Sequence, residues 1–182
     1  SSALRYTIRK NKRARENSYC HLATLSSDGL PSNRTVVFRG LVAGTDALKV
    51  ITDTRSRKVQ ELRRNPVCEV SWYFSATREQ FRIKARAEIC NQSKSLERIE
   101  SWSKLGEQAK TQFFWPTPGR ACDPEKDAAQ LAPNDLGQPP DSFTLLILHP
   151  FCVDHLQLKG NPQIRRVSVF EDAVWKVSAV NP

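Results

Sequence analysis

Short runs of β-branched and apolar residues, separated by turn residues, recur along the whole chain and leave few folds open. The predicted strands are residues 19–25, 34–40, 48–52, 67–74, 79–90, 143–148, 153–158, 164–170 and 174–180. The Asp28-Gly29 pair favours a hairpin between the first two. Helical patterns occur only before the first strand and as inserts between later strands. The spacing therefore predicts a mainly β (α+β) fold with helical inserts, built as an antiparallel barrel and not from βαβ units.

The helical inserts differ in character. Residues 3–16 combine a few apolar residues with six basic ones and predict a basic surface helix. A short helix over 57–64 ends before Asn65-Pro66, and residues 93–114 have helical apolar spacing. Residues 116–140 hold six of the eleven prolines and predict a long loop. We expect residues 1–182 to form a single domain.

The net charge of +9 is unevenly distributed. Residues 1–66 hold 14 Lys and Arg against 5 Asp and Glu, whereas residues 67–182 hold 14 of each. An anionic partner is therefore expected in the first third of the chain. No run approaches the ~20 apolar residues that a membrane helix needs, so we expect no membrane partner.

The five cysteines lie at least 22 positions apart, without CxxC or CxxxH spacing. This scatter predicts no metal site and favours reduced, mostly buried thiols in a cytoplasmic protein. The first residues have no apolar core of a secretory signal, which agrees with a cytoplasmic location.

Residues 54–58 are candidates for binding a phosphate, because they lie where a strand ends and a helix begins. A helix N-terminus has unpaired N–H groups and a partial positive charge, to which Arg57 and Lys58 add cationic side chains. The alternative is a solvated surface helix with an ordinary Ser or Thr cap.

Arg34 is a second candidate. In a regular strand it shares a face with Val36 and Phe38, while Arg39 shares the opposite face with Thr35 and Val37. An arginine that alternates with apolar residues either extends to solvent at a sheet edge or binds an anion. The chain has no GxGxxG or GxxxxGK[ST] loop, so nucleotide binding by those routes is disfavoured.

Several motifs occur together in one order. They are His21–Leu25, Asp28-Gly29-x-Pro31, Asn33–Gly40, Thr52–Lys58, Asn65-Pro66 and Arg78–Arg82, followed by Val153–Leu158, Arg165-Arg166 and Trp175. Together they resemble the pyridoxamine 5′-phosphate oxidase-like FMN-binding family, and in particular a branch of uncharacterised cyanobacterial and plant relatives. The resemblance covers nearly the whole chain except the proline-rich loop.

This resemblance implies a split β-barrel that forms a homodimer, with FMN at the subunit interface. The cofactor-binding residues that it implies are Arg34, Arg57 and Lys58 for the phosphate; Thr35, Val36 and Val37 along the flavin; Thr52 as a further contact; Gln80 near the ring; and Arg166 from the closing strands. Arg39 is implied as a substrate-binding residue. No catalytic acid or base is assigned.

The chain departs from the pattern of the family's vitamin B6 oxidases. Pro162 and Ile164 stand where those enzymes have an arginine and a histidine, Leu156 replaces an aromatic residue, and Arg39 replaces a lysine. A phosphate-bearing B6 substrate would lose an anchor of about 1.5–3 kcal/mol.

Three functions remain open at this point. The first is an FMN-dependent oxidoreductase on an unidentified small molecule, and the second is a pyridoxamine or pyridoxine 5′-phosphate oxidase. The third is a non-enzymatic flavin- or nucleic-acid-binding module, although a nucleic-acid partner is the least favoured.

Overall fold

The computed structural model describes residues 2–123, 127 and 135–182. The eight strands are β1 Tyr19–Leu25, β2 Pro31–Leu41, β3 Leu48–Asp53, β4 Val67–Phe74, β5 Glu79–Cys90, β6 Phe143–Gln157, β7 Ile164–Glu171 and β8 Val174–Val180. They form an antiparallel sheet in the order β3-β2-β1-β4-β5-β6-β7-β8, and an additional β3–β6 pairing closes the first six strands into a barrel. The predicted mainly β split barrel is confirmed.

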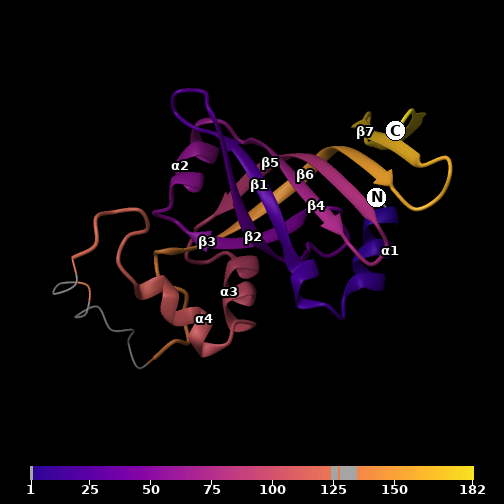
Figure 1. Ribbon diagram of the computed structural model, residues 1–182. Coiled ribbons are helices and arrows are strands. Elements are labelled where there is room, and N and C mark those ends of the chain that lie inside the picture. Colours follow the sequence, from indigo (N-terminus) through magenta and orange to yellow (C-terminus); the bar gives the residue numbers. More distant parts are fainter. Residues whose placement is uncertain (1, 124–126, 128–134) are drawn as a thin grey trace.

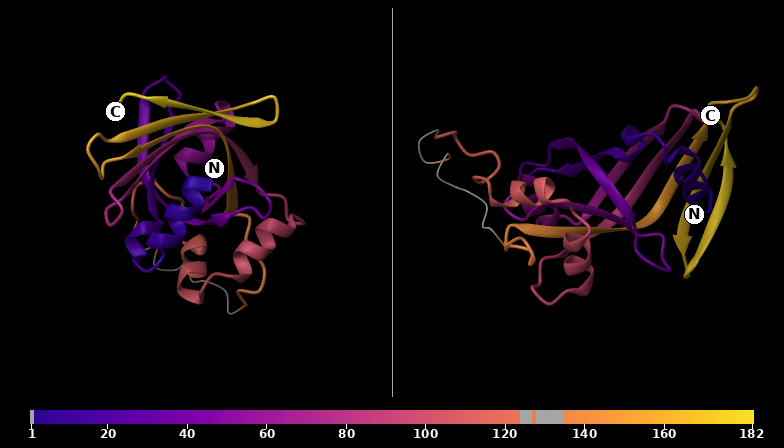
Figure 2. Two further views of the ribbon diagram at one scale, coloured as in Figure 1. Left: turned by 90° about the vertical axis from the view of Figure 1, so that its right-hand side faces the viewer. Right: turned by 90° about the horizontal axis from the view of Figure 1, so that it is seen from below.

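The helices lie around the barrel (Figure 1). They are α1 Ser2–Asn11, α2 Arg57–Arg64, α3 Leu96–Ser103 and α4 Glu107–Thr111, with 3-10 turns η1 Arg15–Ser18 and η2 Gln112–Phe114. Figure 2 shows that β7 and β8 project from one end, near α1, whereas α3 and α4 lie towards the other end.

The barrel interior is filled by alternate residues of neighbouring strands. In β4 every second side chain is buried, including Trp72 and Phe74, and Phe81 of β5 meets them at a ring distance of 5.9 Å from Phe74. A second aromatic cluster joins Trp102 and Phe113 to Phe143 of β6, with ring centroids 4.9–5.7 Å apart. This second cluster holds the segment around residue 113 against the barrel.

The N-terminal helix is shorter and more buried than the predicted surface helix over 3–16. It ends at Asn11, whose Nδ2 donates to the Thr7 carbonyl at 2.9 Å and to Thr77 Oγ1 at 3.2 Å. Leu4, Thr7 and Asn11 are all buried. An asparagine that bonds its own last turn and a neighbouring loop competes with helix continuation, which explains the early end.

A buried polar link connects α1 to the sheet. Glu79 Oε2 accepts from Thr7 Oγ1 at 3.0 Å, and its Oε1 lies 3.0 Å from Nε2 of His155. Burial works against ionisation of Glu79, but hydrogen bonds from Thr77 and Thr7 outweigh it and lower the pKa of this carboxyl. For His155, burial lowers the pKa despite the bond to Glu79.

Two other predicted boundaries are wrong. The expected helix over 93–114 is divided into α3, α4 and η2, because the chain turns before Gly106, which precedes α4. The strands expected at 143–148 and 153–158 are one strand, β6, which continues through Pro150. A register shift against β5 lies at this proline, where a missing N–H costs no ladder bond. Residues 124–126 and 128–134 of the predicted loop lie outside the described residues.

Candidate functional site

Arg34 of β2 is held by a carboxylate and not by solvent. Its Nη2 donates to Glu61 Oε2 of α2 at 2.8 Å, and its Nη1 donates to the Leu22 carbonyl at 3.2 Å and to Thr24 Oγ1. Its side chain is 22% exposed. Within the chain, the anion that Arg34 binds is the carboxylate of Glu61, which is 27 positions away.

Lys58 and Arg57 add two cations to this region. Lys58 Nζ donates to Thr52 Oγ1 at 3.0 Å. Burial lowers the pKa of Lys58, and the nearby charge of Arg34 lowers it further. Arg57 is exposed and has no ion pair within the described part of the chain. We call Thr24, Arg34, Thr52, Arg57, Lys58 and Glu61 the Arg34 cluster. Its three cations and one carboxylate leave a net charge of +2.

The N-terminus of α2 contributes backbone donors. Ser56 occupies the cap position, but its hydroxyl donates to the Asp53 carbonyl at 2.7 Å and makes no capping bond. The interpretation of this segment as an ordinarily capped surface helix is therefore wrong in that detail. Among the described residues, no hydrogen bond engages the amides of Arg57 and Lys58. Such unpaired amides favour an oxyanion.

Two clefts lie on either side of the segment that joins β3 to α2. The larger, of about 760 Å³, runs between α2 and the β1–β2 hairpin and is lined by Arg34 and Arg57 among others; we call it the α2 cleft. The smaller, of about 330 Å³, is lined by Val37, Arg39 and Thr52 together with Phe113 and Trp115; we call it the β2–β3 cleft. Arg34 and Arg39 open to different clefts, so the predicted alternation in this strand is confirmed.

Thr35 and Val36, the other two residues expected to lie along the flavin, differ in exposure. Val36 is buried in the barrel core, so only its backbone can reach a ligand. Thr35 is exposed, and its hydroxyl lies 3.3 Å from Nδ1 of His21 on β1.

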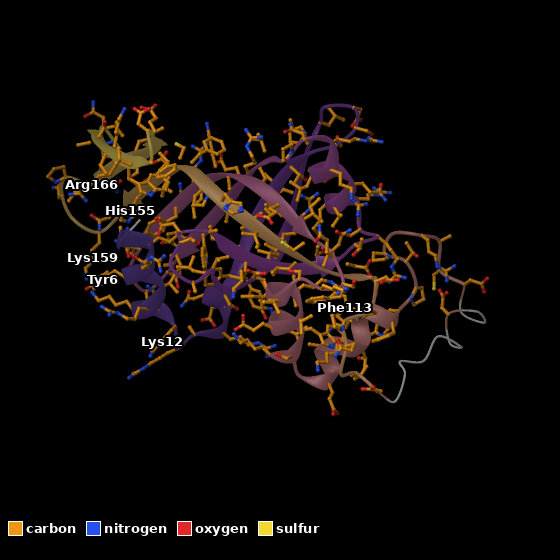
Figure 3. The ribbon with its side chains drawn as sticks, turned by 180° about the vertical axis from the view of Figure 1, so that it is seen from behind. Tyr6, Lys12, Phe113, His155, Lys159 and Arg166 are labelled. Carbon is orange, nitrogen blue, oxygen red and sulfur yellow. The ribbon has the colours of Figure 1, made fainter. Side chains whose placement is uncertain are left out.

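Gln80 and Arg166 lie apart from the Arg34 cluster. Gln80 pairs with Leu156 and Arg166 with His155, so the two residues point to opposite faces of the sheet. Figure 3 shows Arg166 beside His155 at the end of the barrel near α1, whereas Phe113 of the β2–β3 cleft lies at the other end. One chain therefore does not bring all the predicted cofactor residues together.

Sequence reasoning missed Glu61, Thr24 and Trp115. Glu61 follows Arg57 and Lys58 at helical spacing of four and three, so the helix pattern could have placed it on their face. Trp115 carried no such signal. Its carbonyl accepts from Arg55 Nη2 at 2.9 Å. The residue is 57% exposed and lines the β2–β3 cleft.

The donor set fits a flavin mononucleotide. Its phosphate carries a charge of about −2 and prefers Arg, Lys and helix N-terminal amides, which the Arg34 cluster offers. The flavin ring needs a mostly apolar slot with a few polar groups, which the β2–β3 cleft supplies beside the cluster.

A closed split barrel with a cationic, phosphate-suited cluster beside a mostly apolar cleft is the arrangement expected of an FMN-binding barrel protein. The family model "Pyridoxamine 5'-phosphate oxidase, FMN-binding domain" matches residues 1–91. The chain belongs to this family, and its cofactor is FMN. The resemblance read from the motifs is thus confirmed.

Individual relatives agree with this assignment. The chain is 37% identical over 183 residues to "Pyridoxine/pyridoxamine 5'-phosphate oxidase 2" of Arabidopsis thaliana, which covers 96% of this chain and 92% of the relative. The chain also matches the crystal structure of a pyridoxamine 5′-phosphate oxidase-related, FMN-binding protein from Nostoc punctiforme. The two sequences are 38% identical, and the structures superpose with a TM-score of 0.91 over 100% of this chain and 96% of that one. PhzG from Burkholderia lata, at 20% identity, shares the fold with a TM-score of 0.83 over 100% and 91% of the two chains. No helix among the described residues is long and apolar enough to cross a membrane.

Proposed function

We propose that this flavoprotein is an FMN-dependent oxidoreductase that acts on a small molecule, and that two copies of the chain complete each cofactor site. The observation that carries the proposal is the Arg34 cluster. The net charge of +2 on this cluster offsets the charge of a flavin phosphate. The cluster lies beside the β2–β3 cleft, and the two share Thr52.

In this proposal the cofactor residues divide between the two copies. One copy supplies Arg34, Arg57 and Lys58 for the phosphate, with Thr52 as a further donor. Its β2 strand lies along the flavin through the segment 35–37, where Val36 contributes backbone only. The second copy supplies Gln80 and Arg166, since these residues lie away from the cluster in their own chain.

The bound flavin supplies the two-electron chemistry, so the residues of this chain bind, orient and exclude water. Arg39 is proposed to hold an anionic group of the substrate. It lines the β2–β3 cleft and has no ion pair within the described part of the chain. Burial lowers the pKa of Arg39, and an anion would compensate this loss of solvation.

A pyridoxamine or pyridoxine 5′-phosphate oxidase is the second candidate. The name and identity of the Arabidopsis relative favour it. The absence of the family's arginine and histidine at Pro162 and Ile164 argues against it. A non-enzymatic flavin-binding module needs only the same cluster, and a nucleic-acid-binding role would use the basic α1 instead. The five free thiols support a cytoplasmic location for each candidate.

The visible spectrum of the purified protein tests the main proposal. We expect a yellow preparation, or a clear spectral change on adding FMN, with two FMN per dimer by light scattering and absorbance. A colourless protein that shows no change with FMN refutes it. Aldehyde and peroxide formation from pyridoxamine 5′-phosphate distinguishes the candidates, because no turnover at full FMN loading rejects the B6 oxidase.

A further inference from the structure

We propose that Glu61 is a positioning residue that fixes Arg34 for the flavin phosphate, and that it thereby makes the site select phosphorylated over unphosphorylated flavin. The inference rests on the proposed placement of the phosphate at the Arg34 cluster. Glu61 itself would not touch the cofactor and would act through Arg34.

The hydrogen bonds around Arg34 occupy one edge of its guanidinium. Thr24 Oγ1 donates to Glu61 Oε2 at 2.6 Å and accepts from Nη1 of Arg34, while Nη2 of Arg34 donates to the same Glu61 oxygen at 2.8 Å. The three side chains thus form a closed triangle. This triangle holds the edge formed by Nη1 and Nη2.

The adjacent edge of the guanidinium, formed by Nε and Nη2, remains available. No hydrogen bond of Arg34 Nε occurs within the described part of the chain, and Nη2 has a second N–H. These two N–H groups form the fork that grips an oxyanion side-on. Arg55 and Arg165 show the same fork in this protein, since each uses Nε and Nη2 to bind both oxygens of a neighbouring aspartate.

Glu61 is suited to a permanent role of this kind. Its side chain is 11% exposed and lines the α2 cleft together with Arg34. Burial works against its ionisation, but the hydrogen bond from Thr24 and the charge of Arg34 outweigh this and lower its pKa, so it is ionised at neutral pH. A fixed guanidinium loses less conformational freedom when an anion binds than a mobile one does.

The test compares the affinities of FMN and riboflavin, which differ only by the phosphate. Dissociation constants are measured by flavin fluorescence for the wild type, Glu61→Ala and Glu61→Gln. We expect Glu61→Ala to weaken FMN binding about tenfold and to change riboflavin binding less than twofold. Glu61→Gln keeps an oxygen acceptor for Arg34 and Thr24, so we expect its FMN affinity to stay within about threefold of the wild type or to exceed it.

Glu69→Gln is the matched control, because Glu69 pairs with Arg82 at 2.8 Å in a more exposed ion pair on β4 and β5. We expect it to change neither affinity. Thr24→Val removes the hydroxyl that links Glu61 to Arg34. We expect this variant too to lower the ratio of the affinity for FMN to the affinity for riboflavin. It keeps the test decisive if Glu61→Ala does not fold.

Three outcomes contradict the inference. Equal changes in the FMN and riboflavin affinities of Glu61→Ala leave their ratio unchanged and show a merely structural role. Tighter FMN binding in Glu61→Ala shows that Glu61 only opposes the phosphate charge. A wild type that binds neither flavin overturns the proposed function and this inference with it.

Discussion

Replacing Lys58 by methionine tests the placement of the phosphate most directly. Methionine keeps a long unbranched side chain but removes the charge and the hydrogen bond to Thr52. We expect Lys58→Met to fold normally, since burial already disfavours the charged ammonium, as its lowered pKa indicates. The loss should therefore fall on FMN binding and not on the stability of the protein without cofactor.

The expected magnitude follows from the environment of Lys58. A unit charge pair at 4 Å contributes at most about 4 kcal/mol at an effective dielectric constant near 20. Part of this is offset by the cost of keeping the ammonium charged next to Arg34, which the substitution relieves. A charge-assisted hydrogen bond contributes about 1.5–3 kcal/mol net. We therefore expect FMN affinity to fall roughly 10- to 100-fold.

The assay is a calorimetric or fluorescence titration with FMN at constant ionic strength. Lys84→Met is the matched control, because Lys84 is an exposed lysine on β5 outside both clefts. We expect it to bind FMN like the wild type. A loss below threefold in Lys58→Met, or an equal loss in Lys84→Met, would refute the reasoning that places the phosphate beside Lys58.

Three further predictions concern pH and stability. FMN affinity should fall as pH rises through the lowered pKa of Lys58, which lies below the usual 10.5, and Lys58→Arg should move this loss to higher pH in the same titration. The pKa values of His155 and Glu79 are both lowered in the fold, so the free energy of unfolding should decrease as pH falls below about 6.5. Urea unfolding at several pH values should show this decrease. If the free energy of unfolding depends on pH in His155→Gln as it does in the wild type, the role of the histidine is contradicted. Trp72→Ala should lower the free energy of unfolding by about 3–5 kcal/mol, because Trp72 is 1% exposed in the barrel core; a loss below 1 kcal/mol would contradict this packing.

Local patterns predicted most of the strands. Alternation over 67–74 and 79–90 requires only that one face of each strand be buried, and the structure has β4 and β5 at those bounds. Boundaries that depend on distant contacts were wrong. The early end of α1 depends on the bond between Asn11 and Thr77, and the unbroken β6 depends on a bulge at Phe151, next to Pro150.

The sequence by itself determined the family, the cofactor and the candidate phosphate residues Arg34, Arg57 and Lys58, because ordered motifs and local charge spacing carry that information. Only the tertiary structure decided which group Arg34 faces, since Glu61 comes from a helix 27 positions away. It also decided that Gln80 and Arg166 lie apart from the cluster, because strand register sets the face on which each side chain lies. Spacing along a chain describes neighbours within one element, whereas a site built from several elements depends on how those elements pack.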